Sequence, residues 1–262
     1  MSAILTDIDS RGVATVTLNR AEKHNAFDDA VIAELNAIFT DLDGNTQVRV
    51  VILAAQGKSF SAGADLNWMK RMASYNEQEN FADAKGLATM LATLNELSKP
   101  TIARVQGAAY GGGVGLVSCC DIAVASHRAS FCLSEVKLGM IPATISPYVI
   151  ESIGPQAARR YFITAERFSA ETALNIGLIS ECVLDDELDS TIDTLVQALL
   201  HNGPIAITAA KQLIAAVKYS TIDQGLKDKT SQLIADIRCS VEGKEGVSAF
   251  LDKRPANWIR ES

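Results

Sequence analysis

Two apolar runs are each followed directly by a segment of small residues, and this arrangement constrains the fold more than any other feature. Residues 50–54 precede GKSFSAGAD at 57–65, and residues 101–105 precede QGAAYGGGVG at 106–115. Each small-residue segment comes just before a predicted helix. Small residues let the backbone approach a ligand closely, and the first-turn N–H groups of a helix have no partner within the helix. Such groups can hold negative charge that develops on an oxygen.

Apolar periodicity predicts strands alternating with helices over the first half of the chain. The expected strands are 4–9, 13–18, 48–55, 101–105, 121–125 and 130–133. The expected helices are 28–44, 76–98, 155–164, 169–176, 186–201, 204–219, 221–239 and 241–251. This pattern predicts an α/β core over 1–203 and a helical region over 204–262, with Gly203-Pro204 as a candidate hinge.

Composition excludes several classes of protein. The chain has 262 residues, 48% hydrophobic and 21% charged, which is typical of a globular protein rather than a disordered or coiled-coil one. Its net charge of −7 argues against nucleic acid or an anionic membrane as a partner. The N-terminus lacks the pattern of a secretory signal, and the five cysteines show no disulfide or zinc spacing. We therefore expect a cytoplasmic protein with reduced thiols.

Other nucleotide, metal and nucleophile sites are poorly supported. Residues 111–115, GGGVG, lack the G-x-G-x-x-G spacing of a dinucleotide-binding turn, and no Walker loop is present. The three histidines, His24, His127 and His201, are scattered, so no metal site is predicted. Ser61 lacks the context of a nucleophile elbow. Each glycine segment alone could serve only tight packing between a strand and a helix.

Taken together, seven segments resemble the crotonase superfamily of enoyl-CoA hydratases and isomerases in order and spacing. The resemblance spans nearly the whole chain. The segments are LNRAEKHNA at 18–26, FSAGADL at 60–66, GAAYGGG at 107–113, CDIAV at 120–124, EVKLG at 135–139, AETALNIGLI at 170–179 and FLDKRP at 250–255.

The resemblance implies a crotonase-like spiral of ββα turns and a C-terminal helical region that forms a homotrimer or a dimer of trimers. By position, Ala64 and Gly112 would donate the two backbone N–H groups of an oxyanion hole for a thioester carbonyl. The resemblance also implies an acyl-CoA substrate. Because CoA is part of this substrate, no separate cofactor is expected. Residues 23–26, from Lys23 to Ala26, together with Ala62 and Asp65, would border the CoA groove. Lys253 or Arg254 would reach a CoA phosphate, unless this is an ordinary solvated pair.

This chain keeps only one of the two glutamates that are typical of hydratases in the family. A typical hydratase of the family has one glutamate two residues after the triple glycine and another just before the Leu-Gly pair. Here the first position is Gly115 and the second is Glu135. Glu135 lies among apolar residues, where loss of water would raise its pKa towards neutrality. The alternative is a surface glutamate paired with Lys137.

The exact reaction is less constrained than the family. Residues 64–69, 107–121 and 131–135 resemble a bacterial subgroup of leucine and acyclic-terpene catabolism that hydrates 3-methylglutaconyl-CoA or its isohexenyl analogue. Hydration of 3-methylglutaconyl-CoA is therefore the first expectation, with the distal carboxylate of the substrate filling the role lost at Gly115. A Δ3,Δ2-enoyl-CoA isomerase and a general enoyl-CoA hydratase are alternatives. A non-catalytic CoA-ester-binding protein is an alternative of another class. Trp68 is either a core residue or part of the acyl pocket.

Overall fold

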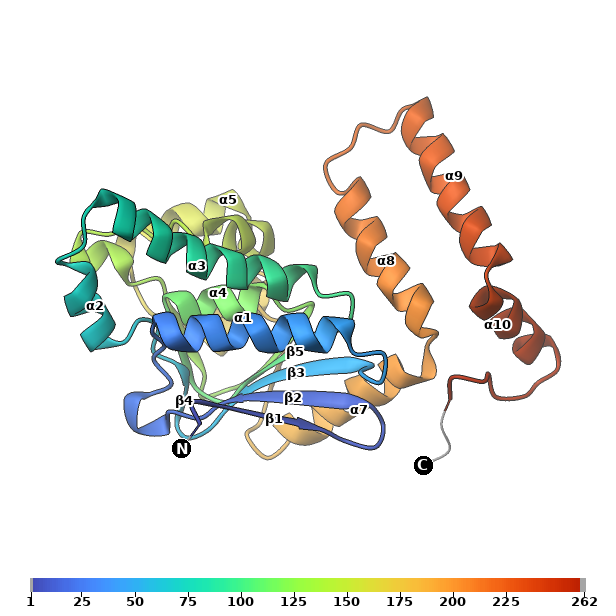
Figure 1. Ribbon diagram of the computed structural model, residues 1–262, viewed down its shortest axis with the longest axis horizontal. Helices are drawn as coiled ribbons and strands as arrows, with labels where there is room; N and C mark the ends of the chain where they lie inside the picture. The colour runs from blue at the N-terminus through green and yellow to red at the C-terminus, as the bar shows by residue number, and fades with distance from the viewer. Residues whose placement is uncertain (1, 260–262) are drawn as a thin grey trace.

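The computed structural model describes residues 2–259, and its core is a pair of β-sheets flanked by helices (Figure 1). Within these residues, the larger sheet has six strands in the order β1-β2-β3-β5-β7-β10. These strands are β1 (Ile4–Ile8), β2 (Val13–Leu18), β3 (Val50–Ala55), β5 (Thr101–Val105), β7 (Ile122–Ser126) and β10 (Glu181–Val183). β1 and β2 form an antiparallel hairpin, and the other neighbours are parallel. Parallel strands joined by helical crossovers confirm the predicted α/β class.

A smaller sheet beside the first contains the strands that position the glycine segments. Its order is β4-β6-β8-β9, with β4 (Ser59–Ser61), β6 (Ala108–Tyr110), β8 (Ser130–Cys132) and β9 (Phe168–Ser169). After β3, β5 and β7 in the large sheet, the chain passes each time to the next strand in the small sheet. This repeated step from one sheet to the other is the predicted ββα spiral.

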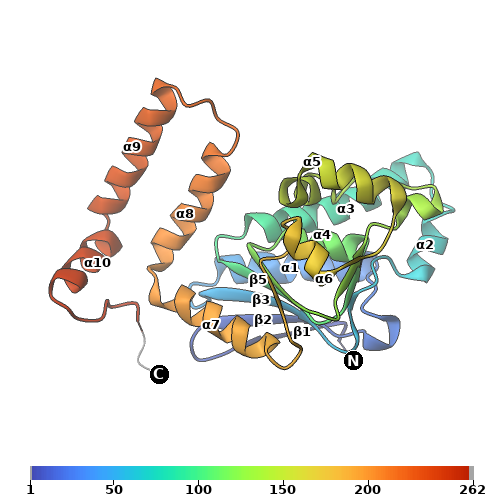
Figure 2. The ribbon, with the colours of Figure 1, turned by 180° about the vertical axis from the view of Figure 1, so that it is seen from behind.

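Helices cover both faces of the large sheet (Figures 1 and 2). Successive side chains of a strand point to opposite faces of the sheet, and apolar side chains on both faces pack against helices. Val16 and Leu53 belong to the main core, which includes residues of α1 and α3. Val50 of β3 and Ile102 of β5 point to the opposite face and pack in a second cluster with residues of α7. The helices of this part are α1 (Asp29–Gly44), α2 (Leu66–Met72), α3 (Glu77–Glu96), α4 (Gly112–Ser118), α5 (Ser146–Thr164), α6 (Ala170–Asn175) and α7 (Leu188–His201).

The last three helices extend away from the core, as both views show. They are α8 (Pro204–Val217), α9 (Gln224–Cys239) and α10 (Val241–Leu251). Lys211 of α8 contacts the core through a 2.7 Å ion pair with Asp121. The expected boundary after residue 203 coincides with the start of α8, and the division into two domains stays a prediction. Over residues 2–259, no helix is both long and apolar enough to cross a membrane.

The main differences from the predicted elements lie between residues 140 and 185. α5 begins at Ser146, but Gly154, with φ of 71°, interrupts its helical backbone, and the second part starts at Pro155 as predicted. The first part, from Ser146 to the break at Gly154, was not among the predicted helices. The strands β9 and β10 have two and three residues. Such short strands form through pairing with neighbours and leave little periodicity in the sequence.

Candidate active site

The two glycine segments meet at the ends of β4 and β6, which are parallel neighbours in the small sheet. Gly63 has φ of +86°, a backbone conformation that favours glycine. A Cβ at Gly63 would lie 2.9 Å from the Tyr110 carbonyl oxygen and 3.6 Å from the Gly112 nitrogen. The absence of side chains therefore allows the two loops to pack backbone against backbone.

Two backbone N–H groups remain available where these loops meet. The neighbouring N–H groups are used, since Asp65 N donates to the Phe27 carbonyl oxygen at 2.9 Å and Gly63 N donates to Ser61 Oγ at 3.2 Å. Gly112 is the first residue of α4, so its N–H has no acceptor within the helix. Within the described part of the chain, no hydrogen bond uses the N–H of Ala64 or of Gly112. Binding of a thioester oxygen by this pair stays a prediction.

Glu135 opens a short 3-10 helix, η2 (Glu135–Leu138), that follows β8. Its carboxylate lies against Gly111, where an added Cβ would be 3.2 Å from Oε1. Oε2 is buried and has no hydrogen-bond partner. Burial raises the pKa of Glu135 above its ordinary value of 4.5. The structure does not support the alternative of a surface glutamate paired with Lys137. Within the described residues, no ion pair involves Glu135, and its Oε2 is buried.

A cavity of about 570 Å³ joins these groups. Its walls are mainly apolar, and its carboxylates within residues 2–259 come from Glu135 and Asp83. The sequence-predicted residues Ala62, Ala64, Trp68, Gly112 and Glu135 all line it. The cavity therefore brings a buried carboxyl group and two free N–H groups to one apolar space, an arrangement suited to proton transfer beside a carbonyl carbon.

Several residues of the cavity were missed by sequence reasoning. Four of them come from α3, which is distant in the sequence from the glycine loops. Asn80, Asp83, Ala84 and Leu87 share one face of α3, and this i, i+3, i+4, i+7 spacing was the available signal. Phe27, Leu66, Ser134 and Leu138 were missed as well. Residues 140–145 also line the cavity, and the sequence had predicted that the bulky segment 140–148 reshapes the acyl pocket.

Asp65 and Lys23, which were expected to border the CoA groove, form an ion pair within the protein. Asp65 is 5% exposed and accepts a 2.8 Å hydrogen bond from Asn67 N as the N-cap of α2. Its Oδ2 also pairs with Arg20 at 3.1 Å and with Lys23 at 3.2 Å. Burial alone would raise the pKa of Asp65, but these donors together hold it below its ordinary value. The Asp65 carboxylate is thus engaged within the protein, and its place beside the CoA groove stays a prediction.

Gly115 is buried in α4 and is not among the residues that line the cavity, so its role in substrate binding stays a prediction. A Cβ at Gly115 would lie 3.0 Å from Ile145 Cβ and would overlap Ile145 Cγ2. Ile145 itself lines the cavity. The position that a Cβ at residue 115 would take is therefore occupied by the Ile145 side chain.

The remaining predicted contacts lie at the edge of the described site. Ala26 is 8% exposed, and its carbonyl accepts a 3.0 Å hydrogen bond from Arg20. Lys253 follows α10, at the far end of the molecule from α2 and α3 (Figure 1). Arg254 forms an ion pair with Glu245 at 2.7 Å. A contact of Lys253 with CoA stays a prediction, and it requires a different copy of the chain.

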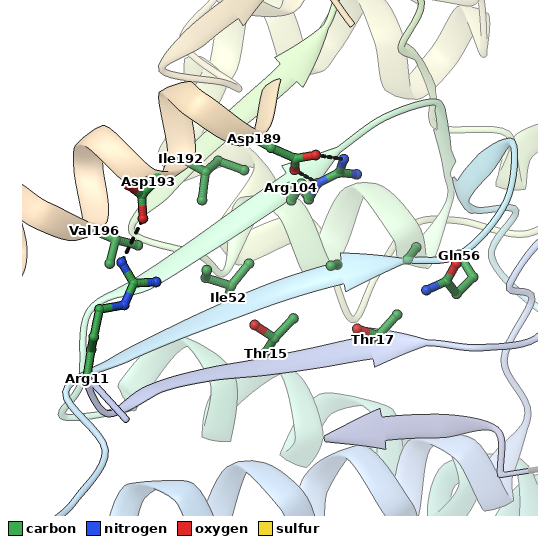
Figure 3. Close-up of a pocket in the computed structure, with 12 residues that line it drawn as sticks. Arg11, Thr15, Thr17, Ile52, Gln56, Arg104, Asp189, Ile192, Asp193 and Val196 are labelled. Atoms are coloured by element: carbon green, nitrogen blue, oxygen red, sulfur yellow. Dashed lines mark hydrogen bonds and ion pairs between the residues drawn. The ribbon is translucent and has the colours of Figure 1, made fainter. Parts of the chain in front are cut away.

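A second cavity of about 430 Å³ lies between the large sheet and α7 (Figure 3). Its charged groups are paired across the gap, Arg11 with Asp193 at 2.7 Å and Arg104 with Asp189 at 2.6 Å. These pairs connect α7 to the sheet, so we assign them to packing. Across residues 2–259, no cluster of three His, Cys, Asp or Glu is arranged to hold a metal ion.

Comparison with known proteins gives consistent matches over the whole chain. The family model described as enoyl-CoA hydratase/isomerase matches residues 9–261. The chain is 32% identical over 244 residues to the short-chain-enoyl-CoA hydratase of Clostridium acetobutylicum, with 92% of each chain covered. It is 32% identical over 263 residues to the 2,3-dehydroadipyl-CoA hydratase of Escherichia coli, covering 98% of this chain and 99% of that one. An enoyl-CoA hydratase structure from Shewanella pealeana has a TM-score of 0.95 and 47% identity, covering 98% of this chain and 96% of that one. This likeness confirms the crotonase-like architecture.

Proposed function

Because the chain belongs to the enoyl-CoA hydratase/isomerase family, we propose that it adds water across the C2=C3 double bond of a 2-enoyl-CoA thioester. The observation that carries the proposal is the shared cavity of Glu135 and the two free N–H groups of Ala64 and Gly112. The reaction needs no separate cofactor, because CoA is part of the substrate. This function replaces the non-catalytic alternative, which gives no reason for a buried, unpartnered carboxyl oxygen.

The roles follow from where charge develops. Addition of hydroxide to C3 pushes electrons onto the thioester oxygen, and the N–H groups of Ala64 and Gly112 would stabilise that oxyanion by roughly 2.7–4 kcal/mol each. Glu135 then donates its proton to C2. Burial raises the pKa of Glu135 above its ordinary value, which increases the fraction of the protonated form that this step needs. We place the CoA moiety along Ala62 and the 23–26 segment.

The finer proposal is that the substrate is 3-methylglutaconyl-CoA, an intermediate of leucine catabolism. The support is the similarity of residues 64–69, 107–121 and 131–135 to the subgroup with this activity. The apolar walls of the cavity, including Trp68 and Leu87, suit the 3-methyl branch.

A second candidate substrate is an uncharged 2-enoyl-CoA such as crotonyl-CoA. The observation that favours it is the charge of the cavity, whose lining within residues 2–259 includes two carboxylates and no Lys or Arg. A distal carboxylate on the acyl group would find no cation there. An isomerase that moves a 3-enoyl double bond is the third candidate, since one glutamate suffices for that reaction.

An activity panel separates these functions. Hydration of 3-methylglutaconyl-CoA and crotonyl-CoA is followed by loss of the enoyl-thioester absorbance, and isomerisation of a 3-enoyl-CoA by its gain. We expect hydration to exceed isomerisation, and kcat/KM to be highest for 3-methylglutaconyl-CoA. Glu135→Gln should lower kcat by ~10²–10⁴ with little change in KM. Double-bond migration without water addition, or no turnover of any thioester, would refute the proposed hydratase.

A further inference from the structure

One face of α3 brings a second carboxylate into the cavity. Asn80, Asp83, Ala84 and Leu87 all line it, as their helical spacing requires of residues on one face. Asp83 is the ionisable member of this set. Glu135 enters the same cavity from η2, about fifty residues later in the sequence. Two carboxylates from separate elements therefore face one substrate space.

Asp83 is held by a neutral donor and not by a cation. The Trp68 indole Nε1–H donates to Asp83 Oδ1 at 2.9 Å. Trp68 is 4% exposed, and its ring centroid lies 6.5 Å from that of Phe27, so surrounding side chains restrict the indole. Within residues 2–259, the described ion pairs include none with Asp83. The indole thus orients the carboxylate without neutralising it, and Oδ2 is left for another hydrogen bond.

Hydration requires a group that orients the attacking water beside C3 and accepts its proton. Gly115 cannot supply this group, because it has no side chain and lies beneath Ile145. A carboxyl group that is oriented and already lies in the cavity meets the requirement. Asp83 is the remaining such carboxylate within residues 2–259, because Glu135 is assigned to C2.

We propose that Asp83, oriented by Trp68, is the catalytic base that positions and deprotonates the water added to C3. The inference rests on the proposed hydratase function. As the water oxygen bonds to C3, one O–H bond breaks and its proton passes to Asp83. The C2=C3 electron pair moves towards the thioester oxygen, and Glu135 then gives its proton to C2. Asp83 afterwards releases a proton to solvent and Glu135 takes one up, which restores both groups.

The test separates the water step from the proton transfer at C2. Exchange of the C2 protons of butyryl-CoA in D2O, followed by NMR, needs Glu135 and the oxyanion hole but no water addition. In Asp83→Asn, the new amide oxygen can still accept the Trp68 N–H, so the fold should be kept. We expect hydration by Asp83→Asn to fall by ~10²–10⁴ while C2 exchange stays within about threefold of wild type.

Matched variants make the result specific. Glu135→Gln should lose both hydration and exchange. Glu77→Gln, which removes an exposed carboxylate from the first turn of α3, should leave both unchanged. Trp68→Phe removes the indole donor, so hydration should fall by less than in Asp83→Asn and exchange should persist.

Three results would overturn the inference. Equal losses of hydration and exchange in Asp83→Asn would indicate a structural role. Retained hydration of crotonyl-CoA would exclude Asp83 as the base. Retained hydration of 3-methylglutaconyl-CoA alone would assign the water to the substrate's own carboxylate. A wild-type protein that exchanges C2 protons but hydrates nothing would contradict the proposed function itself, and this outcome is visible before any Asp83 variant is made.

Discussion

At the scale of single residues, Glu135 combines its proposed catalytic role with a cost to stability. Its Oε2 is buried without a hydrogen-bond partner, and burial raises its pKa above 4.5. Ionisation is therefore less favourable in the folded protein than in the unfolded chain. A residue that must move a proton at C2 benefits from this raised pKa, while the folded state is destabilised once the carboxylate forms.

The stability of Glu135→Gln should consequently depend on pH relative to wild type. Above pH 4.5 the folded wild type retains a proton that the unfolded chain has lost, so its free energy of unfolding falls as pH rises through the raised pKa. Glutamine does not titrate. We expect the advantage of Glu135→Gln to be small at pH 4.5, to grow with pH and then to level off, as measured by urea unfolding at fixed protein concentration. A difference that does not vary with pH would contradict the buried state of this carboxyl group.

A second residue-scale prediction concerns the packing of Gly115 beneath Ile145. Gly115→Ala should destabilise by ~1–3 kcal/mol, because its Cβ overlaps Ile145. Removing Ile145 beyond Cβ should relieve part of that overlap. The double-mutant cycle of Gly115→Ala with Ile145→Ala should therefore be non-additive by ~0.5–3 kcal/mol in unfolding experiments. Gly115→Glu alone should disturb folding before it changes substrate preference.

The control for this cycle is Gly113→Ala in the same helix. A Cβ at Gly113 would lie 2.7 Å from the Ser61 carbonyl oxygen and does not approach Ile145. Its effect should add to that of Ile145→Ala. Coupling of similar size in both cycles would show that α4 responds as a whole and not through the Gly115–Ile145 contact.

At the scale of elements, the N-terminus of α2 determines where the Ala64 amide lies. Asp65 caps this seven-residue helix and pairs with Arg20 and Lys23 from the region of η1 (Ala21–Lys23). Phe27 forms an isolated bridge with Ala64 on the other side. These interactions fix the residue before the cap, which is one of the two proposed oxyanion donors.

Asp65→Ala should therefore reduce both stability and kcat. Loss of a cap alone costs ~1 kcal/mol, and the loss of two ion pairs at a buried carboxylate adds to it. Asp65→Asn keeps an acceptor for the cap and should be affected less. The matched control is Asp223→Ala, which removes the exposed cap of α9, and it should cost ~1 kcal/mol without lowering kcat. Full activity in a folded Asp65→Ala protein would separate the cap from the oxyanion site.

At the scale of the whole molecule, α8, α9 and α10 expose an unusual amount of apolar surface. Ile222, Val241 and Phe250 are 81%, 87% and 82% exposed in the single chain. No side chain of α8 or α9 within the described residues is fully buried. Exposed apolar surface on extended helices is typical of an interface between subunits.

We therefore predict an obligate oligomer, a homotrimer or a dimer of trimers, in sedimentation at micromolar concentration. Phe250→Glu should shift the distribution towards smaller species, because it places a charge on the apolar surface of α10. Ser231→Glu adds the same charge at an exposed polar position of α9 and serves as the control. A wild-type protein that sediments as a monomer would refute the prediction.

The sequence by itself determined the α/β class, most of the long helices and the family, and it predicted Glu135 as the candidate catalytic carboxyl group. These features depend on residues close together in the chain, such as the periodic apolar positions of α1 and the glycine segments that follow β3 and β5. Only the tertiary structure decided that Asp83 shares a cavity with Glu135, that Ile145 covers Gly115 and that Asp65 is engaged as a cap. Each of these facts joins residues from different elements, and local periodicity carries no information about how such elements pack.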